Sequence, residues 1–518
     1  MPCWKGKIRR GERASFLAAA EHWRHNVGRP ATVLDDALTC LAWAALATDP
    51  AAPWEPSLRD QVLTALDQVV RDVGTLDADT QPLLHLWLQI ELPLMLRTAD
   101  RTAGSAPDDR PPSDPASQLA LAWPAWCDAE GLPHAATLSV AWPLLAAWVR
   151  CARLAACLGG QGWSDNLREQ FENFLQQMLR LCLGDGTVAF HTRDELLLER
   201  EFLEAALALT CHDDTRVLAE CCRVVKARRG RARSTPEGLL LSDHAETAGI
   251  ALLRSDWSSQ ALQVAAAIHG SHLQLAVAAA GRPLFNGDWE ATVTVDGQIQ
   301  VPCGSWREVV WFSDEEIDYW EVELPLEDGW MLNRQLLLCR SARWLLLSDT
   351  VQGERPAEIE CRVQLPCGEG VGFVGAAESH EGWLRRSQDV GLVLPLWLPE
   401  WRAEAADGAL TAEQDRLVAT RRRTGSHLYL PLVLVGDSRQ LRLPYTWRRL
   451  TVAESLQIVS AEQAVGMRMQ LGKKQWLFYR SLTRPANRSV LGQNVADDFL
   501  AAELQPDGQA RPLVRIET

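Results

Sequence analysis

Residues Thr292–Val301 read TVTVDGQIQV, and this stretch decides the fold of the C-terminal half of the chain. Apolar and polar side chains alternate on both sides of the central Asp296-Gly297 pair, with the two-residue period of a half-buried β-strand. Asp-Gly supplies the positive φ angles that a tight hairpin turn requires. The stretch therefore predicts two antiparallel strands joined by a two-residue turn.

The same alternation recurs downstream of this hairpin, in short segments separated by turn residues. The segments are Tyr319 to Leu324, Ile359 to Leu365, His427 to Val435, Gln440 to Leu443 and Met467 to Leu471. A closing hairpin is expected from Phe499 to Leu504, a turn at Pro506 to Gly508, and Pro512 to Ile516. Many short strands with turns between them predict an antiparallel β-sandwich over residues 240–518.

Upstream of residue 235 the apolar residues repeat with the period of an α-helix. Ser57 to Asp60 has the form of a capping box, and the apolar stripe that follows comprises Leu58, Val62, Leu63, Leu66, Val69, Val70 and Val73. A second stripe comprises Leu167, Phe171, Phe174, Leu175, Met178, Leu179 and Cys182. Further helices are expected in Gln81 to Leu96, Thr137 to Leu158 and Glu195 to Leu209. Residues 1–235 are therefore predicted to form an all-α domain, a stacked or ring-like helical array, with the boundary in Lys226 to Gly238.

Length, charge and cysteine content restrict the class of protein. A chain of 518 residues predicts two or more domains, and a formal net charge of −15 argues against nucleic-acid and membrane partners. The thirteen cysteines include no Cys-x-x-Cys pair, which favours reduced thiols. With no signal-peptide h-region in residues 1–30, the expected location is cytoplasmic. Walker-type, dinucleotide-binding and Gly-x-Ser-x-Gly motifs are absent from the sequence.

Four segments between Thr247 and Val351 carry a resemblance to a known family. They are Ala248-Gly249-Ile250-Ala251-Leu252-Leu253-Arg254-Ser255-Asp256-Trp257, His269-Gly270-Ser271-His272, Gly281 to Asp288, and Arg334 with the Trp344 to Asp349 strand. This stretch resembles the β-domain of the heparinase II/III-like polysaccharide lyases. The resemblance implies an (α/α) toroid followed by an antiparallel β-sandwich. It also implies an acidic, uronate-containing polysaccharide or oligosaccharide as partner, held in a cleft between the two parts, with cleavage by β-elimination.

The sequence departs from the family pattern at the catalytic positions. The family's acid/base is usually a Tyr of the helical half, with an Asn-His element nearby. Here Tyr319, Tyr429, Tyr445 and Tyr479 all lie in the β half, and no His of the helical half is adjacent to Asn. Asn286 stands where the family's Asp-x-Gly turn has its Asp. These departures put orthodox lyase activity in doubt.

β-Elimination requires proton transfer at the carbon next to a carboxylate, and neutralisation of that carboxylate. His134 and His191 are the candidates for proton transfer, and Arg193 or Arg334 for the carboxylate, because a guanidinium matches the shape of a carboxylate. The alternative for His191 and Arg193 is an exposed loop after a helix C-cap. For Trp123 and Trp126, which flank Pro124, stacking on a sugar ring is expected near the cleft, although most indoles fill cores.

A structural divalent metal, zinc, is a further possibility that the resemblance implies, with His269, His272 and Asp288 as ligands. On a regular strand two residues three apart face opposite sides, so joint ligation requires a bulge or turn at Gly270. The alternative is two ordinary polar residues at a strand end, with Asp288 as a turn residue after Gly287.

Two functions follow. The first is a heparinase II/III-like protein that acts on or binds acidic polysaccharide, with His272 shaping the site from the β half. The second is a non-catalytic scaffold that binds sugar or protein and has lost the lyase residues. The missing helical tyrosine favours the second.

Overall fold

The computed structural model describes residues 16–21, 34–49, 52–72, 76, 81–102, 115–158, 163–184, 186–191, 198–226 and 239–517. The chain forms two compact units, which we call the helical unit and the β unit. The helical unit comprises Met1–Met178 and Arg200–Arg216, and the β unit comprises Leu179–Glu199 and Val217–Thr518. Two segments that the sequence assigns to the helical domain, residues 179–191 and 217–226, thus group with the strands. The predicted boundary spans Lys226 to Gly238, and of this segment only Lys226 is described.

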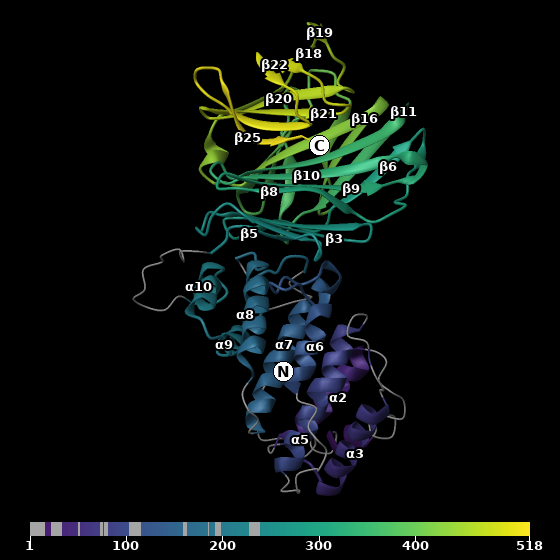
Figure 1. The fold of residues 1–518 in the computed structure, drawn as a ribbon, viewed down its shortest axis with the longest axis vertical. Coiled ribbons are helices and arrows are strands. Elements are labelled where there is room, and N and C mark those ends of the chain that lie inside the picture. The colour runs from purple at the N-terminus through teal and green to yellow at the C-terminus, as the bar shows by residue number, and fades with distance from the viewer. Residues whose placement is uncertain are drawn as a thin grey trace. The chain divides into compact units, whose positions relative to one another are not determined.

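The helices of the N-terminal half follow the predicted segments (Figure 1). They are α2 Leu34–Thr48, α3 Pro56–Asp72, α4 Pro82–Leu84, α5 Leu92–Thr102, α6 Pro115–Ala122, α7 Leu138–Cys157, α8 Asp165–Arg180, α9 Arg200–Leu207 and α10 Asp213–Cys221. A π-helix, η1 His85–Glu91, joins α4 to α5, and the 3-10 turns η2 Trp123–Ala125 and η3 Ala135–Thr137 precede α7.

The predicted apolar stripes account for the packing of these helices. In α3 the buried residues are Leu58, Val62, Leu66 and Val69, which recur every three or four positions. In α8 the stripe residues Phe171, Phe174, Leu175, Met178 and Leu179 are all 0% exposed. Each fully buried side chain of this size stabilises the fold by roughly 1.5–3 kcal/mol. Both helices are therefore held by one apolar face, as their sequences predict.

Helix α7, with 20 residues, is the longest helix described in this unit, and it is rich in apolar side chains. By length and hydropathy alone, Ala135–Cys157 would be long enough to cross a membrane, but 61% of its most apolar window is buried inside the protein. Its Arg150 donates to Glu91 of the π-helix, whose carboxylate is 1% exposed. Packing within the protein therefore accounts for the apolar composition of this helix.

The β unit begins with an antiparallel five-stranded sheet in sequential order, β1-β2-β3-β4-β5. Its strands are β1 Asp243–Ala245, β2 Ile250–Arg254, β3 Leu262–His269, β4 His272–Ala279 and β5 Arg282–Asp288. This sheet contains most of the segments that carry the family resemblance, and we call it the first sheet.

An eleven-stranded sheet follows, with the main order β12-β13-β14-β16-β11-β10-β9-β8. Outside this order, β15 pairs with β16, and β6 pairs with β11 and β7. Its strands are β6 Glu290–Val295, β7 Gln298–Ile299, β8 Arg307–Ser313, β9 Ile317–Pro325, β10 Met331–Cys339, β11 Trp344–Pro366, β12 Gly372–Gly375, β13 Gly382–Arg385, β14 Asp389–Pro395, β15 Gly408–Glu413 and β16 Arg416–Val435. A 3-10 turn, η4 Glu327–Gly329, lies between β9 and β10. The predicted hairpin at Thr292–Val301 is confirmed, since Asp296 and Gly297 join β6 to β7 with φ of 49° and 80°.

The last two sheets have the orders β17-β20-β21-β24-β25 and β19-β18-β22-β23. Their strands are β17 Tyr445–Leu450, β18 Val452–Glu454, β19 Gln457–Ile458, β20 Ala464–Leu471, β21 Lys474–Ser481, β22 Arg488–Val490, β23 Gln493–Val495, β24 Phe499–Leu504 and β25 Ala510–Ile516. The predicted closing hairpin is confirmed by β24 and β25. The strand predicted at Gln440 to Leu443 is wrong, because Gln440–Arg442 forms a 3-10 turn, η5.

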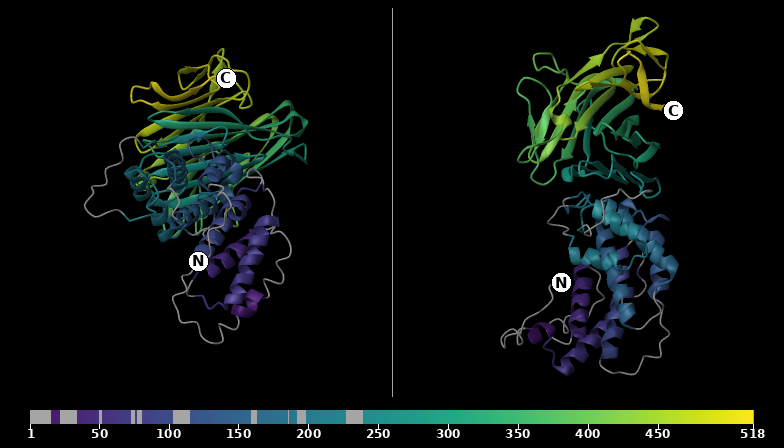
Figure 2. Two further views of the ribbon diagram at one scale, coloured as in Figure 1. Left: turned by 60° about the horizontal axis from the view of Figure 1, so that its bottom comes forward. Right: turned by 90° about the vertical axis from the view of Figure 1, so that its left-hand side faces the viewer.

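The sheets of the β unit stack in layers with an apolar core on each side of the eleven-stranded sheet. One core joins the first sheet to this long sheet, for example through Leu275 and Leu347. The other joins the long sheet to the sheet of β17 and β20, for example through Trp344 and Phe478. Figure 1 shows the teal, green and yellow strands in this succession, and Figure 2 shows from two further directions that the yellow strands cover the green ones. The first sheet thus has one face in a core and a second, outward face.

Candidate functional site

The outward face of the first sheet carries the polar residues that the core does not use. Strand alternation sends Leu273 and Leu275 of β4 into the core, and their neighbours His272 and Gln274 to the opposite face. Cross-strand pairing places Gln263 of β3 and Asn286 of β5 on this same face. We call it the outer face.

The end of α8 and the loop that follows it, residues Leu179–His191 of the β unit, are held against the outer face, and we call this segment the docking loop; residue 185 is not described. The Gln263 side chain donates to the backbone carbonyls of Arg180, at 2.7 Å, and Cys182, at 3.1 Å. Gly184, with φ of 85°, approaches Gly281 so closely that an added Cβ would lie 3.0 Å from the Gly281 Cα. Glycine is thus required at position 184 both for its φ and for its lack of a side chain.

Asn286 holds the end of the docking loop by bonds in both directions. Its Oδ1 accepts the Phe190 N–H at 2.7 Å, and its Nδ2 donates to the carbonyls of His191, at 2.8 Å, and Val188, at 3.4 Å. Phe190 has φ of 67°, which is costly for a bulky side chain. Such strain persists where the surroundings fix the backbone, and it concentrates at functional sites. An amide serves here where a carboxylate could not, because two of the three partners are carbonyl acceptors.

His191 is half-buried at the end of this loop, with one ring nitrogen occupied. Its Nδ1 lies 3.1 Å from the Ala189 carbonyl oxygen, which can only accept, so Nδ1 of the neutral ring carries the proton. The lone pair of Nε2 then has no partner among the described residues. This is the tautomer that a general base requires. Arg193, two positions along the chain, lies outside the described residues.

His134 lies in the helical unit, and its bonded ring nitrogen is Nε2, whereas that of His191 is Nδ1. Its Nε2 is 3.1 Å from the Pro124 carbonyl oxygen, and its backbone N–H donates to Trp126 O at 2.9 Å. The residue immediately precedes the 3-10 turn η3, and it accepts from the Thr137 hydroxyl through its own carbonyl. Its described bonds thus close a tight turn at the start of α7.

Trp123 and Trp126 differ from the prediction that they lie near a cleft. They are 4% and 0% exposed, and both contact Trp148 edge to face, at ring-centroid distances of 5.1 and 6.1 Å. Phe174 of α8 contacts Trp123 in the same way at 5.5 Å. Neither indole offers a ring face to a sugar, because the two rings form the aromatic core of the helical unit.

His269 and His272 lie at the turn between β3 and β4. Gly270, with φ of 57°, makes the turn that the spacing requires, and the two histidines pair directly across it, exposed on the outer face. Asp288 lies on the same face but pairs with Gln274, one diagonal step from His272. Among the described residues, no three His, Cys, Asp or Glu side chains are grouped so that they could hold a metal ion. The three residues therefore do not fit a zinc site here, and no step below uses a metal.

Arg334 is a core residue, contrary to its predicted role at a substrate carboxylate. It is 1% exposed, its Nε donates to Asp349 at 2.8 Å, and its Nη1 donates to the Trp289 carbonyl. The guanidinium also lies over the rings of Trp289 and Trp306. Burial raises the pKa of Asp349, and the Arg334 charge opposes that rise. The family-like Arg and Asp thus form a buried structural pair.

The four tyrosines provide no free phenol in the β unit. Tyr319, Tyr429 and Tyr479 are 0%, 1% and 0% exposed, and burial raises the pKa of Tyr429 to about 12. The Tyr319 hydroxyl donates to Glu321, which the Arg480 guanidinium also binds. Tyr445 donates to Glu381 at 3.0 Å, and its pKa is raised by burial and by that carboxylate. A tyrosine acid/base is therefore not available from these residues.

Two further pairs of histidine and carboxylate are structural. Glu172, 3% exposed, accepts from His212 Nδ1, at 3.0 Å, and from the Thr215 hydroxyl near the start of α10. Glu308 accepts from His244 Nε2, at 2.5 Å, and from the Trp320 indole. Each carboxylate has several protein partners, so both pairs stabilise the local fold, although Nε2 of the exposed His212 has no partner among the described residues.

Sequence reasoning missed the anchors of the docking loop. The sequence indicates Asn286 only as a departure from the family's Asp and Gly281 only as the start of a family-like segment, and it gives no sign of Gln263. The available signal was a polar residue at the outward positions of apolar strands, since strand alternation alone places Gln263 and Asn286 away from the core.

Comparison with protein-family models and with curated proteins finds no match. Solved structures do match. A heparinase III structure has a TM-score of 0.61 at 10% identity, covering 92% of this chain and 80% of its own. The heparan sulfate lyase HepC from Pedobacter heparinus has a TM-score of 0.54 at 13% identity, covering 92% and 79%. A second heparinase III has 0.59 at 11%, covering 92% and 82%. The chain therefore has the fold of these lyases, which confirms at the level of fold the resemblance seen in the sequence.

Proposed function

We propose that this protein binds an acidic, uronate-containing polysaccharide or oligosaccharide at the docking loop and cleaves it by β-elimination, with His191 as the base. The observation that carries the proposal is Nε2 of His191, which has no partner among the described residues and lies on a strained loop end that Asn286 fixes. The fold of heparinase III supports it, with the helical unit as a divergent (α/α) toroid and the stacked sheets as the β-sandwich.

The chemistry requires little more than a placed base and a neutralised carboxylate. His191 Nε2 removes the proton from the carbon next to the uronate carboxyl group. The neighbouring carbon–oxygen bond breaks, a carbon–carbon double bond forms, and the leaving oxygen takes a proton from the His191 imidazolium. Arg193 keeps its predicted role at the carboxylate, where a guanidinium stabilises the charge that develops. His272 keeps its predicted role of shaping the site from the β half.

The same residues support a second function, a non-catalytic scaffold that binds sugar or protein. The burial or bonding of all four tyrosines favours it, since the family's usual acid/base has no counterpart among them. The two functions differ in one measurable respect, which is whether the bound glycan is broken.

The test is turnover by the purified full-length protein on heparan, chondroitin, alginate, hyaluronan and pectate chains and on their oligosaccharides. Unsaturated uronate, detected by its ultraviolet absorbance, supports the lyase. Glycan binding without product on any of these chains supports the scaffold and rules out elimination of these substrates. The cytoplasmic location stays a prediction, and within it imported oligosaccharides are the expected substrates.

A further inference from the structure

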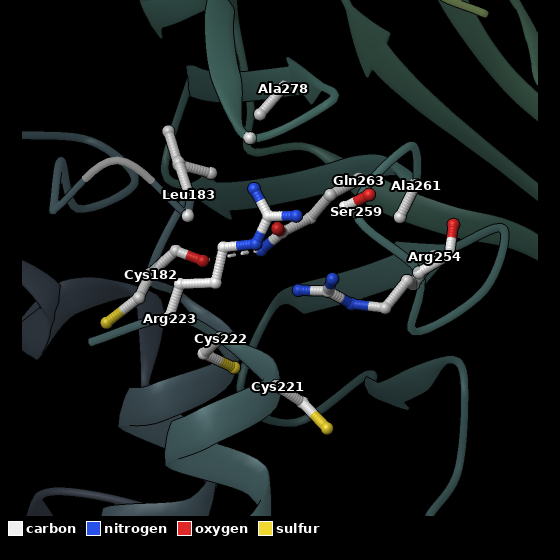
Figure 3. Close-up of a pocket in the computed structure, with 13 residues that line it drawn as sticks. Cys182, Leu183, Cys221, Cys222, Arg223, Arg254, Ser259, Ala261, Gln263 and Ala278 are labelled. Carbon is white, nitrogen blue, oxygen red and sulfur yellow. Dashed lines mark hydrogen bonds between the residues drawn. The ribbon is translucent and has the colours of Figure 1, made fainter. Parts of the chain in front are cut away.

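A pocket lies beside the docking loop, within the β unit, where two arginines converge (Figure 3). Its walls come from Cys182 and Gly184 of the docking loop, from Cys222 and Arg223 after α10, and from Arg254 of β2. The pocket is partly open to solvent, and about 20 Å³ of it is accessible to the centre of a water molecule. Figure 3 shows both guanidinium groups reaching into this space from different walls.

Arg254 is a buried cation. It is 7% exposed, and no described residue forms a hydrogen bond or ion pair with its guanidinium. Its Nη2 is fully enclosed and unbonded. The ring of Trp257, 4.3 Å from the guanidinium carbon, is its nearest compensation. A buried charge ordinarily has an opposite charge or several hydrogen bonds, so this arginine lacks what its position requires.

The groups around Arg254 do not supply the missing negative charge. Burial raises the pKa of the Cys222 thiol to about 11, so it is neutral near pH 7. The Asp256 carboxylate accepts from the Ser258 N–H, at 2.6 Å, and from Arg343, at 3.0 Å. The electrostatic character of the pocket is therefore positive.

Arg223 reaches the pocket through an unfavourable backbone conformation. Its N–H bonds to Glu220 O and the Val224 N–H bonds to Ala219 O, which is the Schellman end of a helix. Arg223 occupies the left-handed position, with φ of 63°, where glycine is the usual residue. Its guanidinium lies against Gly281, where an added Cβ would come within 3.2 Å of Nη1. The positive φ of Arg223 and the absence of a side chain at Gly281 thus allow the Arg223 guanidinium to reach the pocket.

We infer that the pocket between Arg223 and Arg254 binds a tetrahedral oxyanion, a sulfate or phosphate group. Two guanidinium groups from different walls suit a ligand that accepts hydrogen bonds on several sides, whereas a carboxylate presents two oxygens in one plane. Ser259 of the pocket wall provides a further hydroxyl donor. The inference stands apart from the proposed function, although a sulfated sugar would be one source of such a group.

Calorimetric titration of the full-length protein with sodium sulfate, at ionic strength held constant with chloride, tests the inference. We expect binding of sulfate to the wild type, and at least tenfold weaker binding, about 1.4 kcal/mol, in both Arg223→Gln and Arg254→Gln. Lys226→Gln is the matched control. The substitution removes the same charge three residues from Arg223, and Lys226 is exposed and does not line the pocket. Its affinity should equal that of the wild type.

Several results would overturn the inference. These are no sulfate binding above the chloride background, an equal loss in Arg223→Gln and Lys226→Gln, or acetate binding as tightly as sulfate. Arg223 is exposed, so its variant remains informative even where Arg254→Gln fails to fold. Methyl sulfate distinguishes the two sources of the anion. If methyl sulfate binds as tightly as sulfate, the ligand is a sulfate ester. If methyl sulfate does not bind while phosphate does, the ligand is a free inorganic anion. No glycan or turnover is needed, so this test and that of the proposed function can fail separately.

Discussion

Replacing Asn286 by alanine should release the end of the docking loop. The substitution removes two well-formed hydrogen bonds, to the Phe190 N–H at 2.7 Å and to the His191 carbonyl at 2.8 Å, and a longer one to Val188. At about 1 kcal/mol net for each good bond, the docked loop loses about 2 kcal/mol. That loss corresponds to about thirtyfold more frequent opening.

Amide hydrogen exchange of a peptide covering residues 186–191, read by mass spectrometry, measures this opening directly. We expect exchange of the Phe190 amide to accelerate about thirtyfold in Asn286→Ala. Asn286→Asp should accelerate exchange as well, because a carboxylate keeps the acceptor but faces two carbonyl oxygens. Gln274→Ala is the control, because this polar residue lies on the same face and has no hydrogen bond to the described part of the loop. Unchanged exchange in Asn286→Ala would show that the amide does not hold the loop.

Three further outcomes follow from the packing. Gly184→Ala should destabilise loop docking more than Gly186→Ala in the same exchange experiment. Both residues have positive φ, but at Gly186 nothing lies within 4 Å of an added Cβ. Equal effects of the two substitutions would contradict the close approach of Gly184 to Gly281. Arg334→Ala should lower the free energy of unfolding of the β unit by about 3–5 kcal/mol in urea, since Asp349 is left buried and unpaired; a loss below about 1 kcal/mol would contradict the core role. Burial lowers the pKa of His427 below its ordinary 6.5, so the unfolded chain takes up the proton first and stability falls as pH decreases through 6.5. His427→Gln should reduce that fall, measured by urea unfolding at pH 7.5 and 5.5, and an identical fall in the variant would count against it.

Much of the fold follows from local patterns in the sequence. The stripes of α3 and α8 and the hairpins at Asp296-Gly297 and Phe499–Ile516 are determined by residues near one another in the chain, so periodicity and turn chemistry suffice. The segment Gln440–Arg442 alternates like a strand yet forms a 3-10 turn. Alternation over so few residues does not decide between the two, and non-local pairing does.

The candidate site was predicted less completely, because its parts meet through tertiary contacts. His191 was found by its residue type, but its anchor Asn286 lies 95 positions away. Arg334 and Trp126 had the right chemistry for substrate binding, yet they are buried, and composition does not reveal burial. Arg254 lies in a segment that resembles the family, but only the structure shows that its guanidinium has no hydrogen-bond partner among the described residues.

The measurement that tests the central claim most directly is a comparison of product formation by His191→Ala and His134→Ala on whichever uronate chain binds most tightly. We predict that unsaturated uronate accumulates with the wild type and with His134→Ala, while His191→Ala binds the chain with unchanged affinity and forms at least a hundredfold less product, the smallest effect typical of a lost general base. Product formation by His191→Ala at the wild-type rate, or none by the wild type on a chain that it binds, would contradict the account.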